Sequence, residues 1–376
     1  MRIVAVQTGL SPKSVLGGTI TDREFLTRIA DRGVDVHLLV EDGEPVVEHP
    51  NFTPHTWRRR LRKKLPYIGN MDVAIDLRQL LKRLPPVDWI RFNSPYSVGL
   101  GAVTSSAGLR IWGSYLHLEN RPFWRLVDRW LPARCDLITC LSPDTRNDLV
   151  RICPRVDDER TIIVPMGIDA GRFDRARPRR AAVRARLGIA ADEVLVLFVG
   201  VLSRRKGVAD LVAAWRRIAN TAGARLLIIG KPVEEDQAAL VTDLAAADRR
   251  VTHLPGVPYE EMPDYFVAGD VFFFPSYLEG YGIVVGEAMA NGMPVVTTRA
   301  KGIRGVIAEG ETALAGDVGD VDTHAAHLRR VIQDEMLRRR LGDAGRRRIA
   351  THFAWDGIID RLMLALEQPV RAGSAA

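Results

Sequence analysis

The chain has 376 residues, of which 47% are hydrophobic and 26% are charged, a composition typical of a globular protein. At roughly 100–200 residues per domain, this length predicts two domains. The formal net charge of +7 is spread over both halves of the chain, which disfavours nucleic-acid binding and favours small anionic ligands. Because no apolar run approaches about 18 residues and the N-terminal run is too short for a signal peptide, we expect a cytoplasmic protein.

The three cysteines are Cys135, Cys140 and Cys153. Their number is odd and no two of them form a Cys-x-x-Cys pair, which disfavours a disulfide framework and indicates a reducing compartment. We therefore expect three buried thiols that behave as small hydrophobic side chains.

Apolar, β-branched runs alternate with amphipathic stretches in the first part of the chain. Residues 2–8 predict a strand, 21–33 predict a helix, and 35–40 predict the next strand. Further strands are predicted at 89–94, 110–116 and 136–142. This alternation is typical of a parallel sheet that helices cover on both faces.

The alternation breaks at 167–193, where charge, glycine and proline mix, and we interpret this segment as a linker followed by the start of a helix. A second series of strands is then predicted at 194–200, 224–230, 251–256, 271–276 and 294–298. Beyond about residue 324 the sequence predicts helix. The fold class is therefore α/β, with two doubly wound parallel-sheet domains. Their predicted bounds are 1–168 and 190–355, followed by a C-terminal helix at 356–376.

Residues 276–296 carry the clearest functional pattern. Glu279 follows an apolar run that predicts a buried central strand, and 282–290 predict a helix that stops at the next Asn-Gly turn. The loop then presents a helix N-terminus, whose N–H groups favour phosphate. Glu287 lies in the second turn of that helix. Because carboxylates accept hydrogen bonds from hydroxyl groups, the pattern favours a ligand with hydroxyl groups on both sides of a phosphate, such as a nucleotide sugar.

The segment EGYGIVVGEAMANGMPVV also resembles the motif of two glutamates separated by seven residues that marks retaining GT-B glycosyltransferases of family 4. Other stretches resemble the family in the same order, most strongly within 161–320: VPMGIDAGRF, FVGVLSRRKG, VTHLPGVPYEEMPDYFVAGDVFFFPS and GIRGVIAEGETA. The resemblance covers most of the chain. It implies a GT-B fold, in which two Rossmann-like domains face a cleft and the C-terminal helix crosses back to the first domain.

The resemblance assigns roles to the segment that follows the central strand. It implies that Glu287 holds the nucleotide ribose and that Glu279, a candidate catalytic residue, faces the donor sugar. It also implies that the backbone of Tyr281, Gly282 and Ile283 meets the sugar and the diphosphate.

A basic loop follows the first strand of the second domain. Lys206 resembles the family's diphosphate-binding lysine and is a second candidate catalytic residue. The family often has arginine where this chain has Val201, so either Arg204 or Arg205 is expected to take that place.

The first domain resembles the family more loosely. Gly17 and Gly18 resemble a Gly-Gly loop that abuts the donor phosphate and the acceptor, and His117 resembles the histidine that lines the sugar site, a third candidate catalytic residue. In the second domain, Gly256 and Val257 are expected to form the base pocket through their backbone edges.

The implied activity is transfer of a sugar from an NDP-sugar to a hydroxyl group of a glycan, a glycolipid or a small molecule. The resemblance implies retained anomeric configuration and no metal ion or other cofactor. Two alternatives stay open: another GT-B enzyme, such as a nucleotide-sugar epimerase, and a non-catalytic module that binds nucleotide sugars.

Three other patterns favour structural interpretations. Asp320–Asp322 mimics a metal-binding Asp-x-Asp, but it opens a predicted helix and is expected to cap it. The eight histidines include no close pair with metal-ligand spacing. The strand at 2–8 is not followed by Gly-x-Gly-x-x-Gly, which disfavours a nicotinamide dehydrogenase.

The dense basic run is WRRRLRKKLPYIG, at 57–69. It is interpreted either as a solvated helix face or as a docking surface for an anionic membrane or an anionic acceptor. Aromatic residues flank the run without interleaving, so it fits nucleic acid poorly. The docking interpretation would place the protein at the inner face of the membrane.

Overall fold

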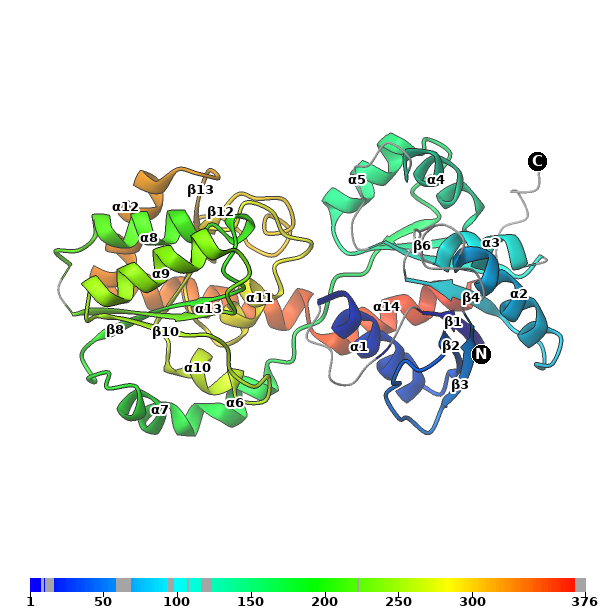
Figure 1. The fold of residues 1–376 in the computed structure, drawn as a ribbon, viewed down its shortest axis with the longest axis horizontal. Coiled ribbons are helices and arrows are strands. Elements are labelled where there is room, and N and C mark those ends of the chain that lie inside the picture. The colour runs from blue at the N-terminus through cyan, green and yellow to red at the C-terminus, as the bar shows by residue number, and fades with distance from the viewer. Residues whose placement is uncertain are drawn as a thin grey trace. The chain divides into compact units, whose positions relative to one another are not determined.

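The computed structural model describes residues 1–7, 10, 17–58, 69–93, 98–106, 108–115, 124–221 and 223–368. The chain divides into two compact units. Unit 1 comprises Met1–Pro165 and Ile358–Ala376, and unit 2 comprises Met166–Gly357. Each unit is a sheet with helices packed on it (Figure 1).

Unit 1 has a parallel sheet of seven strands in the order β3-β2-β1-β4-β5-β6-β7. Its strands are β1 (Arg2–Val6), β2 (Asp35–Glu41), β3 (Phe52–Trp57), β4 (Trp89–Phe92), β5 (Arg110–Tyr115), β6 (Leu137–Cys140) and β7 (Thr161–Ile163). Its helices are α1 (Gly17–Asp31), α2 (Gly69–Leu81), α3 (Leu100–Ser105), α4 (Trp124–Trp130), η2 (Pro132–Arg134) and α5 (Pro143–Ile152).

The core of unit 1 is formed by apolar side chains of the strands and of the helices that cover them. Cys135, Cys140 and Cys153 lie in this core as free thiols, which confirms the sequence-based expectation. Burial raises the pKa of Cys140 to about 12, so this side chain behaves as a hydrophobic group and not as a nucleophile.

The C-terminal helix α14 (Trp355–Glu367) belongs to unit 1 from Ile358 onwards. Trp89 Nε1 donates a hydrogen bond to the carbonyl oxygen of Leu366 at 3.1 Å. The guanidinium of Arg110 lies 4.3 Å from the centre of the Trp89 ring. The last turn of α14 is thereby fixed to β4, and the Trp89 ring is also held by Arg110 of β5.

Unit 2 has a parallel sheet of six strands in the order β10-β9-β8-β11-β12-β13. Its strands are β8 (Val194–Val199), β9 (Ala224–Ile229), β10 (Val251–Leu254), β11 (Val271–Phe274), β12 (Val295–Thr298) and β13 (Ala313–Gly316). Its helices are α6 (Gly171–Ala176), η3 (Arg177–Arg179), α7 (Arg180–Arg186), η4 (Arg204–Lys206), α8 (Val208–Arg217), α9 (Glu235–Ala247), α10 (Met262–Ala268), α11 (Ile283–Ala290), α12 (Val321–Gln333) and α13 (Glu335–His352).

The helices of unit 2 form two layers. Helix α8 packs against α9 and α12 on one face of the sheet, and α10, α11 and α13 lie on the other face (Figure 1). Strand β11, whose residues are all buried, lies at the centre of the sheet, as the sequence predicts. Asp320 caps α12 by accepting a hydrogen bond from the backbone N–H of Thr323 at 3.1 Å, so the capping interpretation of Asp320–Asp322 is confirmed.

The structure differs from the sequence-based expectation at 167–193. We expected a linker followed by the start of a helix, but helical structure begins at Gly171 and most of this segment forms α6, η3 and α7, which pack against α10. Phe173 meets Phe266 edge to face, with ring centres 5.5 Å apart, and Arg184 pairs with Asp270 at 2.8 Å. The many charged residues hid the helical pattern in this part of the sequence. In the structure, its arginines bind carboxylates and carbonyl groups of α10 and of the residues that join α10 to β11.

Candidate active site

The strand order of unit 2 reverses between β8 and β11, which is where ligands bind in open α/β sheets. The loop after β8 contains η4, with Arg204–Lys206. The loop after β11 covers residues 275–282 and leads into α11. The cationic and acidic residues that the sequence singles out therefore come from two neighbouring loops at this reversal.

Backbone contacts join these two loops. The carbonyl oxygen of Arg205 accepts a hydrogen bond from the backbone N–H of Tyr277 at 2.9 Å, and Ser276 Oγ lies 2.9 Å from the same oxygen. Gly207 has a φ of +68°, and a Cβ atom at this position would lie only 1.9 Å from the carbonyl oxygen of Pro275. Glycine is required here because the two loops approach each other backbone to backbone.

Lys206 and Glu279 meet between the loops. Lys206 Nζ lies 2.7 Å from Glu279 Oε1, and Ser276 Oγ donates a hydrogen bond to the same oxygen at 2.6 Å. Both charged side chains are largely buried, with 14% and 9% of their surface exposed. Burial lowers the pKa of Lys206, and the carboxylate of Glu279 opposes this effect. Two of the three candidate catalytic residues are thus in direct contact.

The two arginines of η4 point to different partners. Arg204 pairs with Asp236 at 2.7 Å and is mostly exposed. Arg205 Nη1 donates a hydrogen bond to the carbonyl oxygen of Leu278 at 2.9 Å and lies 3.7 Å from Glu279 Oε2. The structure therefore brings Arg205, and not Arg204, to the Lys206–Glu279 pair.

Helix α11 begins directly after the loop. Gly282 caps it in the left-handed conformation, with a φ of +69°, and Ile283 is its first residue. The helix ends at Ala290 before the left-handed Gly292, as predicted. The first N–H groups of an α-helix have no partner within the helix, so this end can bind an anion. Tyr281 is buried beside it, and burial raises the pKa of its hydroxyl group well above the ordinary value.

Gly302 also supports this site, although it was not predicted from the sequence as a site residue. It has a φ of +83°, and a Cβ atom there would lie 2.3 Å from the carbonyl oxygen of Glu279. The backbone N–H of Glu279 donates a hydrogen bond to the carbonyl oxygen of Lys301 at 3.1 Å. The loop after β12 therefore supports the backbone of Glu279 from the other side.

Glu287 lies on α11 with 9% of its surface exposed. Arg172 Nη1, from α6, donates a hydrogen bond to Glu287 Oε1 at 3.0 Å. Burial raises the pKa of Glu287 to about 7, although Arg172 acts in the opposite direction. Arg172 was not found from the sequence, because it falls in the segment interpreted as a linker.

The expected base pocket lies at the carboxyl end of β10. Gly256 and Val257 follow this strand, and no atom lies within 4 Å of the position that a Cβ atom on Gly256 would take. The same loop continues to Tyr259, whose hydroxyl oxygen lies 2.6 Å from Arg172 Nη1. The base loop and Glu287 thus share Arg172 as a partner.

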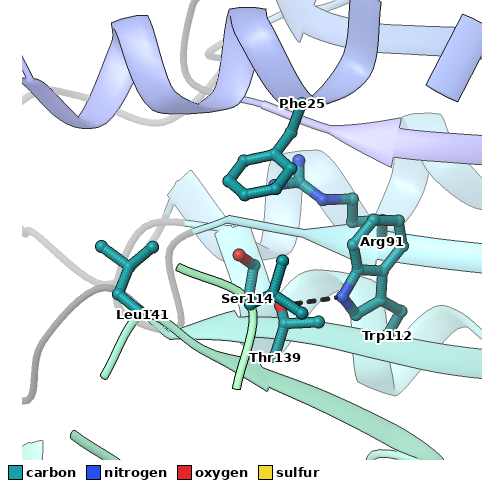
Figure 2. A pocket seen from close by; sticks show the side chains of 7 residues that line it. Phe25, Arg91, Trp112, Ser114, Thr139 and Leu141 are labelled. Atoms are coloured by element: carbon teal, nitrogen blue, oxygen red, sulfur yellow. Dashed lines mark hydrogen bonds between the residues drawn. The ribbon is translucent and has the colours of Figure 1, made fainter. Parts of the chain in front are cut away.

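In unit 1, Gly17 and Gly18 are the first two residues of α1. His117 lies outside the described residues, as does most of the basic run at 57–69. Deeper in this unit, Arg91 of β4 forms a buried ion pair with Asp22 of α1. Arg91 also contributes to the lining of a small cavity, which Figure 2 shows with Phe25, Trp112, Ser114, Thr139 and Leu141.

Among the residues that the structure describes, no three or more His, Cys, Asp or Glu side chains are grouped so that they could hold a metal ion. No helix in these residues is both long enough and apolar enough to cross a membrane.

Two family models match consecutive parts of the chain. The model described as Glycosyltransferase Family 4 matches residues 17–172, and the model described as Glycosyl transferases group 1 matches residues 179–348. The chain belongs to glycosyltransferase family 4. The division between the two matched segments falls close to the boundary between units 1 and 2 of this family 4 protein.

Several curated relatives are similar to this family 4 protein. D-inositol 3-phosphate glycosyltransferase of Geodermatophilus obscurus is 34% identical over 58% of the chain and 50% of the relative. Alpha-maltose-1-phosphate synthase of Mycolicibacterium smegmatis is 32% identical over 63% of the chain and 64% of the relative. The chain thus spans between half and two thirds of the length of these relatives. A longer match, at 28% identity, covers 90% of the chain and 87% of the D-inositol 3-phosphate glycosyltransferase of an Arthrobacter species.

Solved structures show the same fold at low sequence identity. Sucrose-phosphate synthase from Thermosynechococcus elongatus matches with a TM-score of 0.80 and 22% identity, over 96% of the chain and 97% of its own. HepE from Anabaena, in complex with UDP and glucose, matches with a TM-score of 0.76 and 17% identity, over 97% of the chain and 99% of its own. The family 4 protein therefore has the predicted GT-B fold, with two Rossmann-like units.

Proposed function

We propose that this protein transfers a sugar from a nucleoside diphosphate sugar to a hydroxyl group of an acceptor. The observation that carries the proposal is the contact between Lys206 and Glu279 at the reversal of the sheet, directly before the N-terminus of α11. This arrangement offers a cation and free N–H groups for a diphosphate, and a carboxylate for sugar hydroxyl groups, from two neighbouring loops and the helix that follows one of them.

The diphosphate is assigned to Lys206, Arg205 and the first turn of α11. A buried cation, a second cation and a helix N-terminus can together stabilise the negative charge that develops on a leaving diphosphate. These groups stay in place during the reaction because backbone hydrogen bonds join their loops.

The ribose is assigned to Glu287 and the donor sugar to Glu279. Among the described residues, the structure gives Glu287 Oε2 no hydrogen-bond partner, whereas Oε1 is bonded to Arg172. One carboxylate oxygen is therefore open to a ribose hydroxyl group. Glu279 points its carboxylate at the diphosphate-binding lysine, which suits a sugar attached to that diphosphate.

We further propose that the anomeric configuration is retained and that neither a metal ion nor a covalent intermediate is needed. Lys206 and Arg205 supply the positive charge that a divalent cation supplies to leaving diphosphates in other sites. In this mechanism the acceptor hydroxyl attacks from the face that the diphosphate leaves, and a diphosphate oxygen takes its proton.

A panel of donors tests the proposal. Thermal unfolding is followed with UDP-, GDP- and ADP-sugars, since a ligand at 100 times its Kd stabilises the folded chain by about 2.7 kcal/mol. A stabilising donor is then incubated with the protein and the products are separated. Slow release of free NDP supports a transferase, and an isomerised donor supports an epimerase. A bound but unchanged donor, with any acceptor, supports a binding module.

The acceptor class is tested through the basic run at 57–69. We propose that this run docks the protein on an anionic membrane, which suits a glycolipid acceptor. Binding to phosphatidylglycerol vesicles should then decrease steeply with salt, because the screening length shortens to about 8 Å at 0.15 M. An absence of binding at low salt would leave a solvated helix face and favour a soluble acceptor.

A further inference from the structure

Arg172 is fixed at several points of contact. Its Nη1 atom lies 2.6 Å from the hydroxyl oxygen of Tyr259, and its Nη2 atom donates a hydrogen bond to the carbonyl oxygen of Tyr259 at 3.1 Å. The guanidinium lies 4.3 Å from the centre of the Tyr259 ring, and only 14% of the side chain is exposed. A guanidinium held in this way has a defined direction, because its N–H donors form a rigid plane.

Arg172 also donates a hydrogen bond of 3.0 Å to Glu287 Oε1. Since that oxygen is occupied, the carboxylate plane is set by Arg172 and the free Oε2 atom takes a defined position. Three separate elements are thereby joined: α6, the loop after β10 and α11.

Other charged groups around α11 are engaged elsewhere. Strands β11 and β12, which pack against α11, contain no ionisable side chain. Helix α13 also packs against α11, and it carries Arg346, which pairs with Asp174, and Arg348, which donates to the carbonyl oxygen of Val306. Asp174 belongs to α6 and also pairs with Arg177. Within the described residues, Arg172 is the cation that contacts Glu287.

We propose that Arg172 is a positioning residue for nucleotide recognition: it orients the Glu287 carboxylate toward the ribose and supplies its counter-charge, and it ties that carboxylate to the base loop through Tyr259. This inference rests on the proposed function, because it assigns the ribose to Glu287. It extends that function by adding a residue outside the loops after β8 and β11 and a link between ribose and base recognition.

The proposal has a consequence for pH dependence. An ionised carboxylate accepts stronger hydrogen bonds from hydroxyl groups than a neutral acid does. Burial already raises the pKa of Glu287, and Arg172 opposes that shift. Removal of the cation should raise the pKa further, so that less of Glu287 is ionised at pH 7. Nucleotide affinity should then recover as the pH increases.

The test compares Arg172→Met and Arg172→Lys with wild type. UDP, GDP and ADP are first titrated into wild type by calorimetry, and the tightest binder is used at pH 6, 7, 8 and 9. Arg172→Met should weaken binding about fivefold at pH 7 and clearly less at pH 9, because a rise of one unit from a pKa of about 7 lowers the ionised fraction at pH 7 from about one half to about one tenth. Arg172→Lys keeps the charge and should show a smaller loss of affinity without the added pH dependence.

Arg175→Met is the matched control, because Arg175 lies on the same helix, is mostly exposed and pairs with Asp169.

A double mutant separates positioning from general stability. If Arg172 acts through Glu287, then Arg172→Met should add little to the loss of affinity in Glu287→Gln. Fully additive losses that are equal at every pH would overturn the inference and leave the proposed function intact. If Arg172→Met binds the diphosphate as tightly as wild type does, the inference is likewise overturned and the proposed function is unaffected. If wild type binds none of the three diphosphates, the proposed function itself fails, and the inference fails with it.

Discussion

Lys206 Nζ lies 2.7 Å from Glu279 Oε1, and the two residues come from loops that follow β8 and β11, the strands at which the sheet order reverses. In this arrangement each charge neutralises the other. A bound donor would bring phosphate oxygens to the lysine and sugar hydroxyl groups to the glutamate. The pair therefore marks the point where the diphosphate and the sugar of the donor are expected to join.

Lys206→Ala should weaken NDP binding about tenfold or more, because a hydrogen bond to a charged group contributes about 1.5–3 kcal/mol. Calorimetric titration of the diphosphate measures this directly. Lys82→Ala, which removes a lysine after α2 in unit 1, serves as the control. Equal affinity in wild type and Lys206→Ala would exclude a phosphate role for Lys206.

Glu287→Gln and Glu279→Gln should have different ligand profiles. Glu287→Gln keeps the shape of the side chain but loses the charged acceptor, so it should weaken free NDP and NDP-sugar to a similar extent. Glu279→Gln should weaken mainly the intact NDP-sugar, since free NDP carries no sugar. Titration of both ligands into both variants gives four affinities. If both variants weaken free NDP equally, the assignment of ribose and sugar to the two glutamates is wrong.

Much of the fold could be predicted because its strands are apolar and β-branched. The three strands that were missed either lack that pattern or are too short to show it. Strand β3 contains polar residues and Pro54 and lies at the edge of its sheet, β7 has only three residues, and β13 reads Ala-Leu-Ala-Gly. A strand at the edge of a sheet, or one with small side chains, has few of the apolar, β-branched residues that distinguish a strand from a loop in the sequence.

The acidic half of the candidate site could be predicted because one short segment holds it. Glu279, Gly282 and Glu287 lie within nine residues, so a single strand, loop and helix place them. Arg172 reaches Glu287 from 115 positions earlier in the chain, and Gly302 supports Glu279 from the next loop. Such contacts depend on how helices and loops pack, and no local spacing encodes them.

Gly302→Ala should destabilise the protein and disturb the loop that carries Glu279. The new Cβ atom would lie 2.3 Å from the carbonyl oxygen of Glu279, in addition to the strain of a φ of +83°. Gly319→Ala is a matched control, because Gly319 has the same φ and no atom within 4 Å. The control should lose about 1 kcal/mol of unfolding free energy from backbone strain alone. Chemical denaturation should show a larger loss for Gly302→Ala, and equal losses would mean that the loop moves freely.

The stability of the unliganded protein should depend on pH through Glu287. Burial raises its pKa from 4.5 to about 7. Between these values the folded chain holds a proton that the unfolded chain has released, so stability from this group decreases as the pH rises. Relative to Glu287→Gln, wild type should lose about 2.5 kcal/mol of unfolding free energy between pH 5 and pH 8. A difference between the two proteins that stays constant over this range would contradict the raised pKa.

Turnover should survive EDTA, and the product should keep the anomeric configuration of the donor. Lys206, Arg205 and the N-terminus of α11 stay fixed by the contacts between their loops, so they can stabilise the leaving diphosphate without rearranging. A double displacement would need a second carboxylate on the opposite face of the sugar. NMR of the product determines its anomeric configuration. Assays in EDTA, with and without added Mg²⁺ or Mn²⁺, test whether the reaction needs a metal ion. Activity lost in EDTA and restored by either ion would disprove the metal-free mechanism. A glycosyl–enzyme adduct in the mass spectrum would disprove direct transfer, because a covalent nucleophile would then take the place that we give to the acceptor hydroxyl.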